Sequence, residues 1–265
     1  CVLPFFDRIL AVSKADLKTI CRTSPFPNRV GLHLNGIQSP TDVTRGSFEA
    51  QSLVPDDLQS DESAVHIGWI GRLSPEKNPL ELIAIDKLLR EMLGKEKCWR
   101  IHIFGDGPLC RELRLAIEHA GANQRLRLYG YQKDLRSYLP GLDIVLNTSR
   151  SEGLPISLLE AAHLGIAICS RAIGGIADLA SPGIARGIVA SDGDIQQLVI
   201  ALASLIQSKA HRRQDGEFLQ KRAKKLFNEK RWKKELLEHY RIAKEQKGNS
   251  LVHRWFSKTS RECEQ

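Results

Sequence analysis

The fold of this chain is decided by the stretch Ser151-Glu152-Gly153-Leu154-Pro155-Ile156-Ser157-Leu158-Leu159-Glu160-Ala161-Ala162. It follows the apolar run Ile144–Asn147, which predicts a strand, then a turn with glycine and proline, then a helix beginning near Pro155 or Ile156. A helix that starts there directs unpaired backbone N–H groups, and the positive end of its dipole, into the space above the sheet. This position suits a phosphate.

Two carboxylates frame that helix start. Glu152 lies in the turn, Glu160 lies within the helix, and seven residues separate them. A glutamate in the turn can accept a hydrogen bond from a sugar hydroxyl, and one further along the helix can accept from paired ribose hydroxyls. A single glutamate on a surface helix is most often only solvated, but the strand and turn around this pair favour a binding role.

Strands and helices alternate regularly around this stretch. The apolar patterns predict strands at 65–70, 100–104, 125–129, 144–147 and 166–170, and helices at 79–93, 108–120, 134–139 and 156–164. This alternation predicts an α/β fold, a Rossmann-like doubly wound parallel sheet covered on both faces. Ligands of such a sheet bind outside the carboxyl ends of its strands.

The remaining segments extend this organisation at both ends. Short strands are predicted at 6–13 and 29–37, with Ser13 capping a helix at 14–21. Residues 171–194 are predicted to be loops, and 195–207 and 217–243 carry apolar side chains at helical spacing. The predicted divisions are 1–60, the end of a preceding domain with a linker over 38–63; 61–208, the Rossmann-like domain; 209–247, basic amphipathic helices; and 248–265, a disordered tail.

The composition indicates a soluble cytoplasmic protein with a full core. Of the 265 residues 42% are hydrophobic, and no apolar run reaches the ~18 residues of a membrane span. The six cysteines include no C-x-x-C pair, which indicates reduced thiols, and the eight histidines do not cluster at metal-ligand spacing. We therefore expect neither a metal ion nor a cofactor. The single methionine is Met92, which predicts that the chain is a fragment or a truncated product.

The net charge of +8 is concentrated towards the carboxyl terminus. Residues 209–265 contain seventeen Lys or Arg and eight Asp or Glu, a net charge of +9, so the rest of the chain carries −1. Such a segment suits an anionic membrane surface or nucleic acid, and a well-solvated helix has the same composition. Of the two partners we expect peripheral contact with a membrane and no nucleic acid.

Two further loops carry candidate site residues. Gly71 follows the first strand of the domain and leaves room for a ligand, Arg72 offers a forked guanidinium, and Lys77 offers a mobile point charge, so the three suit a diphosphate. Tyr131 can stack on a base, although aromatic residues at strand ends more often belong to the core. Residues 105–108, Gly-Asp-Gly-Pro, lack the third glycine and the acid of a dinucleotide fingerprint, so NAD binding is not expected.

The basic loop 71–78 and the glutamate pair together resemble the retaining nucleotide-sugar glycosyltransferases of the family-four type, which have two facing Rossmann-like domains, the GT-B architecture. The resemblance covers residues 9–240 and implies that this chain is the C-terminal, donor-binding half with a remnant of the N-terminal acceptor domain. It implies that Arg72, Lys77 and Glu152 act on the reacting groups, the first two on the diphosphate and Glu152 on the donor sugar. The implied donor-binding residues are Gly71, Tyr131, Gly153, Leu154, Pro155, Ile156 and Glu160, with Glu160 on the ribose and Tyr131 beside the base.

The resemblance also covers two turns. Residues 105–108 match a structural turn beside the nucleotide in this family. At 174–178 the family commonly has Gly-Gly-Ile-Pro-Glu, whereas this chain has Gly-Gly-Ile-Ala-Asp. Because Ala177 and Asp178 depart from the pattern, we expect Asp178 to be structural and not catalytic.

The implied activity is transfer of a hexosyl unit from a nucleoside-diphosphate sugar to a saccharide or lipid-linked acceptor, with retention, in envelope polysaccharide or lipopolysaccharide synthesis. The enzyme would work in the cytoplasm or at the inner face of the cell membrane. An epimerase or a phosphorylase of the same architecture would need further acids and bases or a pyridoxal lysine, for which no motif is present. The other alternative is a non-catalytic nucleotide-sugar-binding fragment, or a subunit that lacks its acceptor domain.

Overall fold

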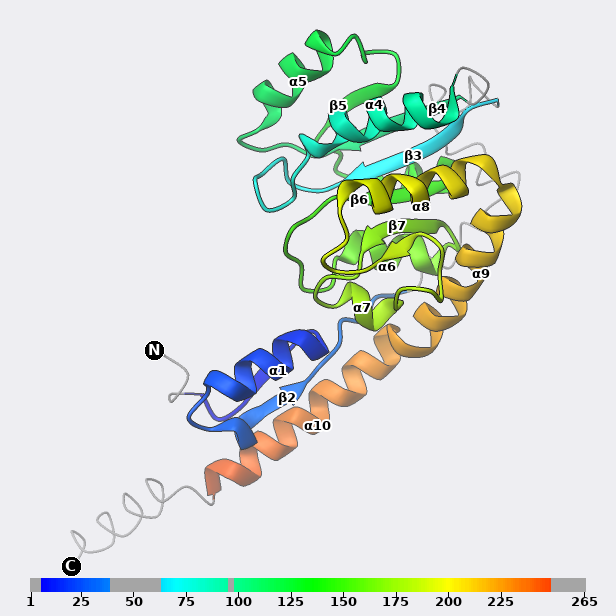
Figure 1. The fold of residues 1–265 in the computed structure, drawn as a ribbon. Helices are drawn as coiled ribbons and strands as arrows, with labels where there is room; N and C mark the ends of the chain where they lie inside the picture. Colours follow the sequence, from blue (N-terminus) through cyan, green and yellow to red (C-terminus); the bar gives the residue numbers. More distant parts are fainter. Residues whose placement is uncertain (1–5, 39–62, 95–97, 249–265) are drawn as a thin grey trace, which may run out of the picture.

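The computed structural model describes residues 6–38, 63–94 and 98–248, which form a six-stranded sheet with its helices and a small two-stranded unit (Figure 1). The small unit contains β1 (Ile9–Ala11), α1 (Lys14–Thr23), the 3-10 turn η2 (Pro27–Arg29) and β2 (Val30–Leu32). The sheet contains β3 (Val65–Ile70), β4 (Trp99–Phe104), β5 (Leu126–Gly130), β6 (Ile144–Asn147), β7 (Ala167–Arg171) and β8 (Ile188–Val189). The helices that follow α1 are α4 (Glu81–Leu93), α5 (Cys110–His119), α6 (Ile156–His163), α7 (Ile176–Leu179), α8 (Ile195–Gln207), α9 (Lys209–Leu226) and α10 (Glu229–Gly248).

All strands of the large sheet are parallel and run in the order β5-β4-β3-β6-β7-β8. The chain passes outward from β3 to β4 and β5, and then returns to place β6 on the other side of β3, where Trp69 pairs with Leu146. In doubly wound sheets this reversal opens a crevice at the carboxyl ends of the two central strands. The loops after β3 and β6 therefore meet at the ligand-binding position of the fold.

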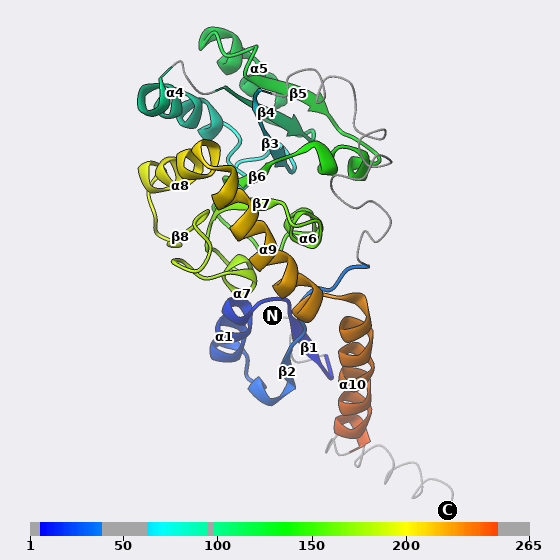
Figure 2. The same ribbon diagram turned by 90° about the vertical axis from the view of Figure 1, so that its right-hand side faces the viewer.

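Helices cover both faces of this sheet (Figure 2). On one face α4, α5 and α8 bury alternate side chains of the central strands, among them Ile67, Trp69 and Ile101. On the other face α6 and α9 pack over Val145 and Ile168. Strands buried on both faces are largely apolar, and the predicted doubly wound parallel sheet is confirmed. None of the described helices is long and apolar enough to cross a bilayer.

The helices α9 and α10 are separate, although the helical spacing runs through 217–243 without a visible break. Asn228 lies between them and caps both. Its amide donates to the carbonyls of Lys224 and Lys225 at the end of α9, and its side-chain oxygen accepts from the backbone N–H of Arg231 in the first turn of α10. Phe227, fully buried beside it, anchors the junction to the core. The new direction carries α10 beneath the small unit (Figure 1).

Three expected elements differ from the structure. The strand expected at 29–37 is η2 followed by the short β2, and the backbone carbonyls of Leu32, its last residue, and of Leu34 bond to side chains of α10. Residues 134–139 fall in two 3-10 turns, Leu135–Ser137 and Leu139–Gly141, because Pro140 has no backbone N–H to donate to the carbonyl of Arg136 and so cannot continue an α-helix. The segment 171–194 contains α7 and β8, which are too short to show a periodic pattern.

Two expectations concern residues that the structure does not describe. Residues 39–62, most of the predicted linker, lie outside the described ranges, and so do residues 249–265 of the predicted tail. The limits proposed for the domains therefore stay a prediction.

Candidate active site

The sequence-predicted site residues come together at the carboxyl edge of the sheet. Gly71, Arg72 and Lys77 follow β3, Tyr131 follows β5, and Glu152 follows β6. The turn 153–155 continues into α6, which carries Ile156 and Glu160. We call residues 151–155 the glutamate turn. Because β3 and β6 are the two central strands, this turn and the basic loop 71–78 face each other across the crevice.

Lys77 and Glu152 form an ion pair across this crevice. The Lys77 Nζ donates to Oε1 of Glu152 at 2.6 Å, and the Glu152 side chain is only 7% exposed. The hydroxyl of Ser149 also lies 2.6 Å from that oxygen. The sequence predicts a mobile charge at Lys77, whereas the structure holds it on Glu152. The pair thus ties the loops of the two central strands together.

A network of polar side chains supports the pair from the interior. The buried Trp69 donates from Nε1 to the hydroxyl of Thr148 at 2.8 Å, and Thr148 donates to the backbone carbonyl of Lys77 at 2.9 Å. Asn147 donates to Ser170 Oγ at 3.2 Å. Sequence reasoning missed Thr148 and Ser149. The available signal is the polar run 147–149, which lies between a buried strand and the glutamate turn.

The start of α6 is open to a ligand. Helix α6 begins at Ile156, as predicted, with Pro155 at its N-cap position. No side chain caps this helix in the described part of the chain, so its first N–H groups are available to an anion. The preceding turn packs tightly against Gly174, whose φ is +50° and where a Cβ would lie 1.8 Å from the carbonyl oxygen of Glu152. Only glycine fits this close approach.

A pocket of about 650 Å³ lies beside the crevice over β3, β4 and β5. Its lining residues are Ile70, Gly71, Arg72, Phe104, Gly105, Asp106, Tyr131, Gln132 and Leu135. Tyr131 is 75% exposed, so it is not a core residue, and Arg72 is exposed and forms no ion pair with a described residue. An apolar floor with an exposed ring and a cation at its rim suits an aromatic, anionic ligand such as a nucleotide.

Glu160 lies outside that pocket lining, on the buried side of α6 facing the loop after β5. Burial raises the pKa of its carboxyl above the usual value, the nearby guanidinium of Arg136 lowers the pKa in part, and Asp134 raises it. Its carboxylate makes no hydrogen bond within the described residues. A partly desolvated carboxylate of this kind accepts strongly from hydroxyl donors.

The Gly-Asp-Gly-Pro tetrapeptide is a structural turn, as expected. Gly105 has a φ of +142°, and a Cβ there would lie 1.8 Å from the carbonyl oxygen of Gly71. A Cβ on Gly107 would lie 2.5 Å from the carbonyl oxygen of Leu73. The two glycines therefore let this turn pack directly on the basic loop. Asp178 is also structural, because its carboxylate accepts from the backbone N–H of Lys14 at 2.8 Å.

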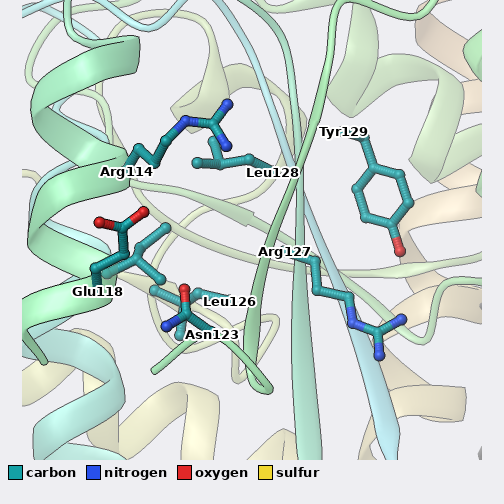
Figure 3. A pocket seen from close by; sticks show the side chains of 8 residues that line it. Arg114, Glu118, Asn123, Leu126, Arg127, Leu128 and Tyr129 are labelled. Atoms are coloured by element: carbon teal, nitrogen blue, oxygen red, sulfur yellow. The ribbon is translucent and has the colours of Figure 1, made fainter. Parts of the chain in front are cut away.

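A second hollow, of about 300 Å³, lies at the outer edge strand β5 (Figure 3). Arg114 and Glu118 of α5 lie on one side of this strand, and Arg127 and Tyr129 lie on the other. The hollow is far from the crevice in the strand order, and it holds charges of both signs without a convergent set of ligands. We assign it no chemistry.

The described residues contain no group of three or more His, Cys, Asp or Glu side chains arranged to hold a metal ion. The sequence Asp192-Gly193-Asp194 has D-x-D spacing, but Asp194 caps α8 by accepting from the backbone N–H of Gln197 at 2.8 Å. A metal-free site stays a prediction.

The fold is that of the GT-B glycosyltransferases. The structure of HepE from Anabaena in complex with UDP and glucose is similar over 89% of this chain and 63% of that one, with a TM-score of 0.75 and 20% identity. The family of glycosyl transferases group 1 matches residues 53–225, more than half of the sequence. The chain belongs to this family.

Two relatives extend the comparison. The amylovoran biosynthesis glycosyltransferase AmsK of Erwinia amylovora is 30% identical over 149 residues, which are 53% of this chain and 36% of that protein. The lipopolysaccharide 1,6-galactosyltransferase of Salmonella typhimurium is 30% identical over 162 residues, 59% of this chain and 44% of that protein. The chain thus matches less than half the length of either relative.

Proposed function

We propose that the protein to which this chain belongs transfers a hexosyl unit from a nucleoside-diphosphate sugar to a saccharide or lipid-linked acceptor, with retention of anomeric configuration. The observation that carries the proposal is the Lys77–Glu152 pair at the uncapped start of α6, beside a pocket with Arg72 and Tyr131 at its rim. The proposal is supported by the similarity to HepE, whose structure contains UDP and glucose, and by the amylovoran and lipopolysaccharide glycosyltransferases among the relatives of this chain.

In this proposal the site works by stabilising the leaving diphosphate. Negative charge develops on that group as the sugar bond breaks, and fixed donors stabilise it without reorganising. In this proposal the donors are the N–H groups at the start of α6, Arg72 at the rim of the pocket and Lys77, which the structure places on Glu152 of the turn before α6. Arginine and lysine then neutralise the charge, so no metal ion is required.

Retention by front-face displacement is the finer part of the proposal. The Glu152 carboxylate is held by Lys77 and Ser149, which supports a role in orienting the donor sugar and not in attacking it. The leaving phosphate takes the proton of the acceptor hydroxyl. Glu160, whose pKa is raised by burial, accepts hydrogen bonds from the ribose.

The location of the reaction is part of the same proposal. The exposed side of α10 carries Lys230, Lys233, Lys234 and Lys244, with Leu237 and Tyr240 70% and 67% exposed. Cations with interspersed apolar groups suit an anionic bilayer surface. A protein working in the cytoplasm at the inner face of the membrane would meet lipid-linked acceptors there, with an acceptor domain supplied outside this sequence.

Calorimetric titration with UDP, GDP and ADP, with and without magnesium, tests the donor site. We expect one of the three to bind, indifferently to the metal, and Glu160→Ala to weaken it about tenfold or more, because hydrogen bonds to a charged group are lost. Glu118→Ala, at the exposed edge hollow, is the matched control and should bind normally. If none of the nucleotides binds, or if Glu160→Ala binds as the unmodified chain does, the proposed donor site is wrong.

An assay of sugar transfer separates the two candidate functions. A transferase releases the nucleoside diphosphate in step with glycosylation of an added acceptor. Tight binding of the nucleotide sugar without transfer by the whole protein would favour the alternative, a binding subunit without catalysis.

A further inference from the structure

Two neighbouring backbone carbonyls of the glutamate turn, those of Gly153 and Leu154, accept hydrogen bonds from different parts of the molecule. The Gly153 carbonyl accepts from the backbone N–H of Gly175, in the loop after β7. The Leu154 carbonyl accepts from the side-chain amide of Asn35 at 2.9 Å. Asn35 lies 119 residues earlier in the sequence and follows β2 of the small unit.

Asn35 is itself rigidly placed. The Arg231 guanidinium of α10 donates to the carbonyls of Leu34 and Asn35 at 2.6 and 3.3 Å. Ile37 donates to the carbonyl of Phe227, and the backbone N–H of Glu229 donates to the carbonyl of Ile37. Residues 34–37 are therefore fastened to the junction of α9 and α10, so the Asn35 amide reaches the turn from a fixed base.

The small unit touches the same turn at a second position. A Cβ on Gly153 would lie 3.2 Å from Cγ2 of Val12, which precedes α1. The carboxylate of Asp178 on α7 accepts from the backbone N–H of Lys14 at 2.8 Å, and α7 directly follows Gly174 and Gly175. The unit thus contacts the turn directly and also holds the helix beside the glycine pair.

These contacts fix the peptide planes that lead into α6. In a trans peptide the N–H points opposite to the C=O, so anchoring the Gly153 carbonyl also orients the N–H of Leu154. The peptide after Leu154 ends in Pro155, which has no N–H, so its carbonyl is the only group by which that plane can be held. Within the described residues Asn35 is its partner, and this plane sets the direction of the uncapped first turn of α6.

We propose that Asn35 is a positioning residue for the donor diphosphate, through which the small unit holds the phosphate-binding turn in its working conformation. This inference rests on the proposed function, because the turn must bind a phosphate for its geometry to matter. Asn35 acts through the backbone and touches no substrate atom.

The test compares Asn35→Ala with Asn123→Ala, an exposed asparagine at the far end of β5. Each is titrated with whichever of UDP, GDP and ADP the unmodified chain binds, and with the corresponding nucleoside. We expect Asn35→Ala to weaken diphosphate binding about three- to tenfold, as for one lost hydrogen bond, and to leave nucleoside binding unchanged. The Asn123→Ala variant should match the unmodified chain in both.

Hydrogen exchange of the ligand-free variants gives a second, independent measurement. Asn35→Ala should speed exchange in peptides covering 151–159 and leave those covering β3 and β4 unchanged, and Asn35→Gln, which keeps the amide, should restore part of the protection. Equal losses of diphosphate and nucleoside affinity, or faster exchange throughout, would indicate general destabilisation and overturn the inference. If the unmodified chain binds none of the nucleotides, the proposed function fails and this inference fails with it.

Discussion

At the residue scale, the central feature of the site is a lysine whose partner comes from the other side of the sheet. Lys77 reads in the sequence as one charge in a basic loop, and its pairing with Glu152 depends on β3 and β6 being neighbours. The two residues are 75 positions apart. Burying the Glu152 carboxylate without a partner would cost free energy, and Lys77 compensates for that cost. The same contact keeps a cation near the start of α6.

Replacing Lys77 by alanine tests this role. We expect sugar transfer by the whole protein to fall roughly a hundredfold to a thousandfold, about 2.7 to 4 kcal/mol, which is typical of losing one fixed donor to a developing negative charge. Lys87→Ala, on the exposed side of α4, is the control and should transfer normally. A decrease of less than about threefold in the Lys77 variant would remove Lys77 from the mechanism. The thermal midpoint should be recorded, since Glu152 loses its partner.

At the element scale, turns and not helices decide the shape of the pocket. The turn after β4 packs on the loop after β3 so closely that Gly105 has backbone atoms of Gly71 where a side chain would be. The same holds for Gly174 against Glu152 on the other side of the crevice. In both places two loops interlock through a glycine, and the strand ends hold the interlocked loops in register.

Two glycine substitutions separate conformational strain from this packing. Gly94, after α4, has a φ of +65° and a ψ of −151°, a backbone conformation that is essentially restricted to glycine, and no atom lies within 4 Å of a Cβ built there. Gly94→Ala should therefore cost only backbone strain, about 1–3 kcal/mol. Gly105→Ala adds a backbone clash, which we expect to cost a further 1–3 kcal/mol or so and to weaken nucleotide binding. Urea unfolding of both variants checks this. Equal unfolding free energies would show that the loops can move apart freely.

At the scale of the whole molecule, the last two helices join the parts. Helix α9 covers the sheet, and α10 turns away at Asn228 to hold the small unit, whose Asn35 reaches back to the site. The positive charge that the sequence concentrates after residue 208 is carried largely by these helices. The exposed basic side of α10 therefore lies next to the small unit, whose Asn35 contacts the glutamate turn.

Sedimentation with vesicles tests the membrane part of the proposed function. We expect the chain to sediment with phosphatidylserine vesicles at low salt and to be released as salt rises, because each surface cation contributes about 1 kcal/mol and is screened. The double variant Lys230→Glu with Lys234→Glu should lose most of this binding, and Lys87→Glu with Lys133→Glu, on other surfaces, should keep it. Failure to sediment at low salt would end the membrane proposal.

The sequence by itself determined the alternation of strands and helices, the parallel sheet and the loops that carry the candidate residues. Those features depend on local pattern: apolar runs, glycine and proline in turns, and the helix start after Pro155. The sequence did not predict α7 and β8, because elements of so few residues show no periodic pattern. It did not predict the break at Asn228 either, because the apolar residues keep helical spacing across it.

Only the tertiary structure decided which loops meet. The pairing of Lys77 with Glu152 follows from the strand order, and the support from Thr148 and Ser149 follows from the depth of β6 in the sheet. The bond from Asn35 to the Leu154 carbonyl joins segments 119 residues apart, and no local pattern encodes such a contact. The sequence determines which chemical groups the side chains carry. Strand order and helix direction, which arise only when the whole chain packs, determine which of these groups come into contact.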